Sequence, residues 1–219
     1  MSIAKICADY LRQSNRNLPS GKLRSGHAHE LVAAYFGYKT TAALRSEEHY
    51  PLSALDEAYI LIPDLLNMDS RREKLKDLPV DLPSNVELAR QLSTFIRENN
   101  YFDGDVWLDR DLSDPINVYI QEDPMVIEDA LGGEMATTNA YFDELYIDEC
   151  DIDVTEDGFA ATLKGSLNGE QDPDKVYSGH KIAFVSHMTM ERVAGRVAFS
   201  RPEFDTDGSV DDDYYDDDL

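Results

Sequence analysis

The hydrophobic positions of this chain change their spacing near residue 100. In the first hundred residues apolar side chains recur every three or four positions, and Ile3, Cys7 and Leu11 form one such stripe. That spacing places them on one face of a helix. From Phe159 to Leu167, by contrast, apolar and polar residues alternate, as they do in a half-buried strand. The pattern therefore predicts an α+β protein with a helical N-terminal part and a strand-rich C-terminal part.

Local signals mark where the first helices begin and end. The first helix should stop at Leu18–Gly21, where Pro and Gly interrupt the pattern. A second helix is expected from about Ser25 to Phe36, ended by Gly37 in a left-handed turn. Thr40 or Thr41 is placed to cap a short third helix.

Two further helices are predicted beyond Pro51. An amphipathic helix should include Leu65 to Lys76, and Ser84-Asn85-Val86-Glu87 is a capping box that begins a helix reaching about Arg97. The apolar run Ala58–Ile62 fits either a buried strand or a helical turn, and periodicity does not separate the two.

In the later part of the chain apolar and polar residues alternate, with one interruption of the pattern. Strands are predicted over Ile182–Met190 and Val193–Phe199, and Asn168–Gly179 is a predicted polar loop. The apolar parity flips between Leu145 and Cys150, which predicts a bulge or strand break near Asp148 and Glu149. These strands together favour an antiparallel sheet or sandwich.

The charge is divided as unevenly as the hydrophobic pattern. Of a net charge of −24, residues 1–100 contribute nothing, because 13 Lys and Arg balance 13 Asp and Glu. Residues 103–157 hold 18 acids and Arg110 as their only base, and residues 205–219 hold 8 acids and no base. Three parts are therefore predicted: a helical domain (1–100), an acidic antiparallel β domain (101–204) and a disordered acidic tail (205–219).

Cysteine content and the N-terminal residues indicate the compartment. Cys7 and Cys150 are the only cysteines, and both are expected to be small buried thiols without a disulfide. The first residues lack the apolar region of a signal peptide, and no apolar run approaches membrane-spanning length. The expectation is a bacterial-type cytoplasmic protein that does not contact membranes.

Residues 25–47 have the layout of a helix–turn–helix. Ala33 and the turn glycine at position 37 would let two helices cross closely. The segment resembles helical modules of uncharacterised bacterial proteins with the pattern Ala-Ala-x-x-Gly-Tyr-x-Thr-x-x-Ala-Leu, a likeness that implies no activity. The net negative charge would repel DNA, so a plain helical hairpin is the favoured interpretation. In the alternative of a DNA-binding regulator, the residues contacting phosphates would be Lys22, Arg24, Lys39 and Arg45.

No catalytic, metal or cofactor site is predicted. His27 and His29 would point to nearly opposite sides of a helix, so they make a poor metal pair. The run Glu203–Val210 nearly spells a calcium loop, but Tyr214 stands where a bidentate Glu is needed. Phosphate-loop, nucleophile-elbow, dinucleotide-turn and paired-cysteine motifs are all absent. A cryptic metal-dependent hydrolase or nuclease therefore stays only as an alternative.

The charge pattern points to a protein partner. A strongly negative surface attracts basic ones, so we expect a non-enzymatic binding or regulatory protein that docks on a basic protein surface. In its sharpest form it would mimic DNA towards a nucleic-acid-binding partner. The β part resembles, in strand rhythm and acidic loops only, accessory β domains of bacterial defence-island proteins, and no residue role carries over. The residues expected at the partner interface are Asp143, Glu144, Asp148, Glu149, Asp151, Asp153, Tyr214, Tyr215 and Leu219.

Overall fold

The computed structural model describes residues 2–155, 157–171, 174, 176 and 179–211. Helices combine with a mixed sheet, so the expected α+β class is confirmed. The chain forms two compact units. Of the described residues, the first unit comprises those up to Arg110 together with Glu191–Arg201, and the second comprises those from Asp111 to Met190 and from Pro202 to Asp211. Because 191–201 fold with the first unit, a single cut near residue 100 does not separate the two.

The first unit is built on a helical core. Five helices follow the predicted order: α1 (Ile3–Ser14), α2 (Ser25–Tyr35), α3 (Thr41–Arg45), α4 (Leu65–Lys74) and α5 (Asn85–Glu98). The 3-10 helix η1 (Leu52–Glu57), between α3 and α4, was not predicted. Two predicted caps are present, because the Thr40 side chain accepts from the Ala43 amide and the Ser84 side chain from the Glu87 amide. The apolar stripes of α1, α2 and α5 are buried against one another.

A small sheet completes this unit. β1 (Ile60–Leu61) pairs in parallel with β2 (Asp105–Val106) and antiparallel with β6 (Ala198–Phe199). The ambiguous segment near residue 60 is therefore a strand. Three arginines of the segment 191–201 lie 5.2–5.5 Å above tyrosine rings of the same unit, in the pairs Arg192–Tyr50, Arg196–Tyr38 and Arg201–Tyr59.

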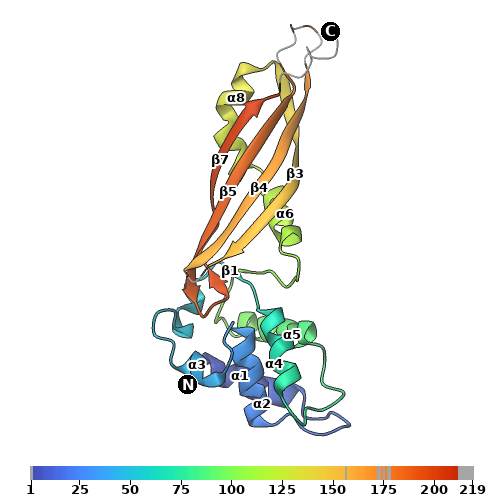
Figure 1. Ribbon diagram of the computed structural model, residues 1–219, viewed down its shortest axis with the longest axis vertical. Coiled ribbons are helices and arrows are strands. Elements are labelled where there is room, and N and C mark those ends of the chain that lie inside the picture. The colour runs from blue at the N-terminus through green and yellow to red at the C-terminus, as the bar shows by residue number, and fades with distance from the viewer. Residues whose placement is uncertain (1, 156, 172–173, 175, 177–178, 212–219) are drawn as a thin grey trace. The chain divides into compact units, whose positions relative to one another are not determined.

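The second unit is a sheet backed by helices on one face (Figure 1). Its strands are β3 (Ala140–Val154), β4 (Gly158–Gln171), β5 (Lys181–Ala194) and β7 (Glu203–Val210), in the order β3-β4-β5-β7. The helices are α6 (Ser113–Glu122), α7 (Met125–Glu128), η2 (Asp129–Leu131) and α8 (Gly132–Thr137). Strand β5 belongs to both units: its residues up to Met190 are part of the second unit, and its last four residues are part of the first.

The structure corrects four expectations for the second unit. Residues 113–137 are largely helical rather than part of a β domain, and Ile116, Ile120, Ile127 and Leu131 form their buried side. Of the two expected architectures, a sheet or a sandwich, the described strands form a single sheet covered by helices on one face, so the sandwich is wrong. The predicted loop at 168–179 begins later, because β4 continues to Gln171.

The fourth correction concerns the acidic tail. Residues 205–210 belong to strand β7, which pairs with β5 from Glu203 to Val210, so disorder from residue 205 is wrong for them. Residues 212–219 lie outside the described part of the chain. β7 is held from the helical side as well, because Gly208 leaves room for Leu131: a Cβ there would approach the Leu131 Cδ2 to 2.5 Å.

Two β-bulges shape β3. Its register against β4 shifts at Asp143 and again at Asp148, so the bulge predicted near Asp148 is confirmed. Each extra residue reverses the alternation of the strand. As a result, Leu145 and Ile147 before the second bulge, and Cys150 after it, share a face of the sheet.

Candidate functional site: the acidic outer face of the sheet

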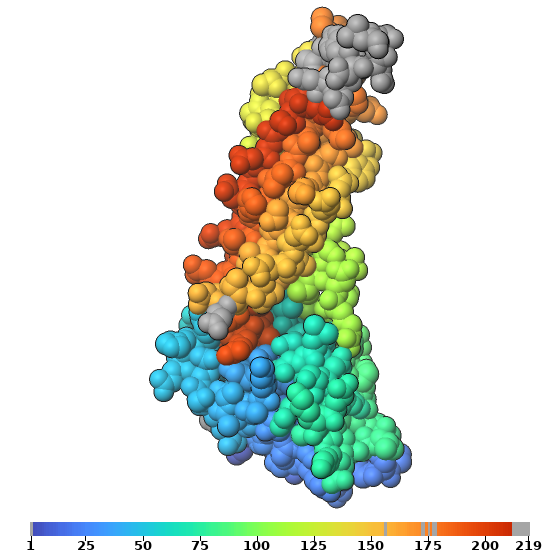
Figure 2. Space-filling view, in the orientation of Figure 1, coloured from blue at the N-terminus to red at the C-terminus, as the bar shows by residue number. Residues whose placement is uncertain are grey.

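The face of the second unit's sheet that points away from its helices is uncovered (Figure 2). β5 shows the division most clearly. Its even-numbered residues from Ile182 to Met190 are buried, whereas its odd-numbered residues from Lys181 to Glu191 are exposed. We call the exposed side the outer face.

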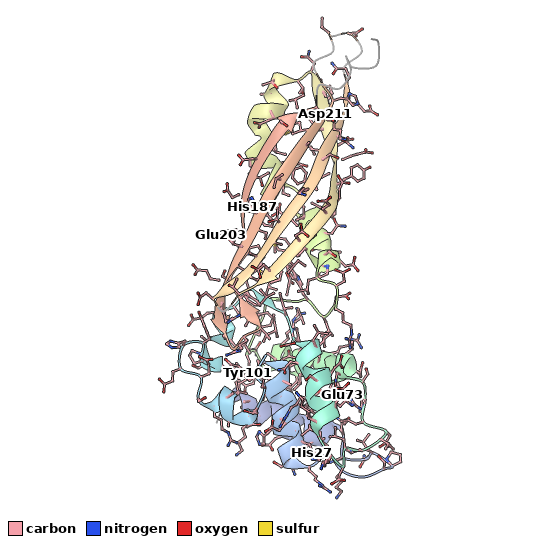
Figure 3. All side chains as sticks on the ribbon, viewed as in Figure 1. His27, Glu73, Tyr101, His187, Glu203 and Asp211 are labelled. Atoms are coloured by element: carbon pink, nitrogen blue, oxygen red, sulfur yellow. The ribbon has the colours of Figure 1, made fainter. Side chains whose placement is uncertain are left out.

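One line of side chains crosses the outer face with a carboxylate at each end. Asp151 on β3 pairs with Thr162 on β4. The Thr162 hydroxyl lies 3.2 Å from Nδ1 of His187 on β5, and His187 pairs with Asp205 on β7. Figure 3 labels His187 and Glu203 on these two neighbouring strands. The two acids are thus the ends of a single cross-strand ladder.

The same arrangement repeats two residues along each strand in both directions. Glu149 and Asp207 end one flanking ladder, and Asp153 and Glu203 end the other. Six exposed carboxylates therefore form two rows, the β3 row (Glu149, Asp151, Asp153) and the β7 row (Glu203, Asp205, Asp207). Strand geometry places neighbours within a row about 6.8 Å apart and the rows roughly 14 Å apart.

Few cations offset these rows. Lys164 lies 2.6 Å from Glu149, and the hydrogen bond and charge of Glu149, with a smaller contribution from Asp151, raise the pKa of the lysine. Among the described residues, the other five acids of the two rows have no ion pair. The outer face therefore keeps a net negative charge.

The structure gathers most of the sequence-predicted interface on β3. Asp143, Glu144, Asp148, Glu149, Asp151 and Asp153 are all exposed there, with Asp143 and Asp148 at the bulges. Glu144 also accepts a hydrogen bond from the Tyr146 hydroxyl at 3.1 Å, which raises the pKa of that tyrosine. Tyr214, Tyr215 and Leu219 lie outside the described residues.

Sequence reasoning missed the β7 row. The alternation of acids with Phe204 and Thr206 in Glu203–Asp207 is the period of a strand. The first ligands of a calcium loop have the same spacing. Because of this likeness and the acidic residues that follow, the segment was interpreted as part of an acidic tail and not as a strand.

The structure does not assemble the residues of the two alternative interpretations, a metal site and a DNA-binding surface, into a site within the described part of the chain. Glu30, the acid next to the candidate metal ligand His29, forms a 2.6 Å ion pair with Arg71 between α2 and α4, and its other oxygen accepts from the Thr41 amide. Lys22, Arg24, Lys39 and Arg45 are exposed, with Arg24 paired to Asp77 at 3.3 Å, and α3 has five residues. Across the described ranges, no group of three His, Cys, Asp or Glu side chains is arranged to hold a metal.

Each unit has a pocket among its described residues. The larger, about 580 Å³, lies in the first unit beside Leu44, Tyr50 and Tyr101. The smaller, about 260 Å³, lies in the second unit between the start of α6 and the bulge of β3 and includes Asp114 and Asp148.

Comparison with known proteins gives no relative: no family model, curated protein or solved structure matches this chain. Within the described residues, none of the helices has the length and apolar character needed to cross a membrane.

Proposed function

We propose that this protein is a non-enzymatic binding protein whose acidic outer face docks on a basic surface of another protein. The observation that carries the proposal is the pair of exposed carboxylate rows on an uncovered sheet. Carboxylates fixed on strands lose little conformational entropy on binding, which favours an ordered acidic surface over a flexible one. Their field also steers a basic partner into contact.

The class of partner we propose is a nucleic-acid-binding protein. Two rows of negative charge roughly 14 Å apart are comparable in separation with the strands that border the DNA major groove, which is about 12 Å wide. The rows together carry about one charge per 3.4 Å of strand length, half the density of duplex DNA at one per about 1.7 Å. The proposed mimicry is therefore of two charged edges, at lower density than DNA.

The test uses two variants with equal total charge. The first replaces the six acids of the two rows by Asn and Gln. The control neutralises six exposed acids of the first unit, Glu48, Asp56, Glu57, Glu73, Glu98 and Asp103. Partners captured by the tagged protein at low salt are purified, and their association rates are measured against ionic strength.

The row variant should associate at least about tenfold more slowly than the natural protein at low salt, and duplex DNA should compete for the partner. The control variant should stay close to the natural protein. An equal decrease in association rate in both variants would show that only total charge matters. An unchanged rate in the row variant would show that the outer face does not take part in binding.

A further inference from the structure

The second half of β3, residues 149–154, is an edge strand with one side of its backbone unpaired. β3 pairs only with β4 in the described sheet. The Thr155 amide donates to the Gly158 carbonyl at 3.0 Å. Hydrogen-bonded pairs alternate along an antiparallel ladder, so Asp153 and Asp151 also bond towards β4. The N–H and C=O groups of Cys150, Ile152 and Val154 consequently point to the open edge.

The side chains of this stretch are exposed on both faces. Residues 151–155 are all exposed, although Ile152 and Val154 belong to the inner, apolar row of the strand. Ile152 is 37% exposed and Val154 is 54% exposed, whereas Phe159 and Ala161, their cross-strand partners on β4, are each 3% exposed. An open edge with an uncovered apolar row is the arrangement that accepts another strand.

We propose that the partner adds an extended segment to this edge of β3, with basic residues on the outer face alternating with apolar residues on the inner face. The proposal rests on the proposed function and specifies how the partner is held. In the added register, the β3 row occupies non-hydrogen-bonded pairs, where facing side chains are closest. Lys or Arg of the segment would then lie directly opposite Asp151 and Asp153.

Charge decides against a second copy of this chain as the occupant. Two β3 edges paired antiparallel would place acids opposite acids, and like charges in that position are destabilising. A basic segment would instead place Lys or Arg opposite these acids, and opposite charges in that position are stabilising. The 260 Å³ pocket lined by Asp114, Asp148 and Glu149 lies at one end of this edge and would take one further basic side chain.

The decisive probe is a fluorescent seven-residue peptide, Lys-Val-Lys-Val-Lys-Val-Lys, measured by anisotropy at low ionic strength with the full-length protein. In the proposed register the valine amides bond to β3 and the lysine amides point away. N-methylation of the valines should weaken binding at least about tenfold, because it removes these donors. The matched peptide N-methylated at the same number of lysines should bind within about twofold of the parent.

A protein variant tests the same bonds from the other side. Ile152→Pro removes an amide that points to the open edge while sparing the ladder to β4, a position where proline is tolerated. Ile152→Pro should weaken binding of the parent peptide about as much as methylation of the valines does. Ile152→Val should leave that binding unchanged. Circular dichroism checks folding, and if Ile152→Pro does not fold, the two methylated peptides decide alone.

The outcomes separate the two proposals. Suppose the peptide binds and the binding falls with salt, but both methylated forms bind equally well. Strand addition is then overturned, while electrostatic docking on the outer face stands. If none of these basic peptides binds at low ionic strength, both proposals fail.

Discussion

Asp69 on α4 shows how a single carboxylate joins separate parts of the first unit. It accepts from the Asn85 side chain at 2.7 Å and forms an ion pair with Arg110. Burial opposes ionisation of Asp69, but the donors Asn85 and Arg110, with the nearby charge of Arg72, outweigh it and lower the pKa. This one residue therefore links α4 to the start of α5 and to the segment that follows β2.

Replacing Asp69 with Asn should lower the free energy of unfolding by about 1 kcal/mol near neutral pH, since it removes a charged hydrogen-bond acceptor that is partly exposed. A depressed folded-state pKa gives stability that is present above the unfolded value, about 3.9, and lost as pH falls through the folded value. Urea denaturation of both proteins should show the difference near neutral pH and little difference in acid. An equal difference at both pH values would contradict the ionic role.

The turn between α2 and α3 is the clearest case at the scale of elements. Gly37 ends α2 with a φ of +85°, in the left-handed region that glycine adopts at low cost. A Cβ at this position would lie 2.6 Å from the Arg196 Cβ. The turn is therefore constrained both by its own backbone and by the segment 191–201 that packs on it.

Gly37→Ala should destabilise the protein by about 2 kcal/mol or more, because strained backbone and overpacking combine. Gly26→Ala is the matched control: Gly26 lies in the first turn of α2 with nothing within 4 Å of its Cβ position. That substitution should raise stability by about 0.5–1 kcal/mol. Thermal unfolding of both variants measures this, and a neutral Gly37→Ala would show that the turn can shift.

At the scale of the whole molecule, the net charge of −24 opposes its own compact state. The Debye length falls from about 30 Å at 0.01 M salt to about 10 Å at 0.1 M and about 3 Å at 1 M. Repulsion across the outer face, over roughly 14 Å, is thus screened near 0.1 M. Repulsion within each row, over about 6.8 Å, is fully screened only at higher salt.

The melting temperature should therefore rise with sodium chloride, by about 2–4 °C for each kcal/mol of repulsion removed. The double variant Asp151→Asn/Asp205→Asn should melt higher than the natural protein at low salt and gain less from added salt. Calorimetry at low and high salt measures both slopes. Identical slopes would mean that the two rows are not where the repulsion is concentrated.

Much of this protein follows from its sequence, because helix formation depends on neighbours along the chain. Apolar spacing, the Thr40 and Ser84 caps and the Gly37 turn placed the helices of the first unit. The parity flip before Cys150 likewise located the bulge at Asp148. The acidic residues of β3 were also predicted as an exposed group.

The strand pairings and the arrangement of the acids depended on contacts between residues that are far apart in the sequence. β1 is a strand because residues near 105 and 198 pair with it. The alignment of Asp151 with Asp205 depends on the registers of three strand pairs. A register is set by packing across the sheet, and a shift of one residue would turn every side chain of a strand to the other face. Local sequence marked the acids, and only the tertiary structure arranged them as two facing rows.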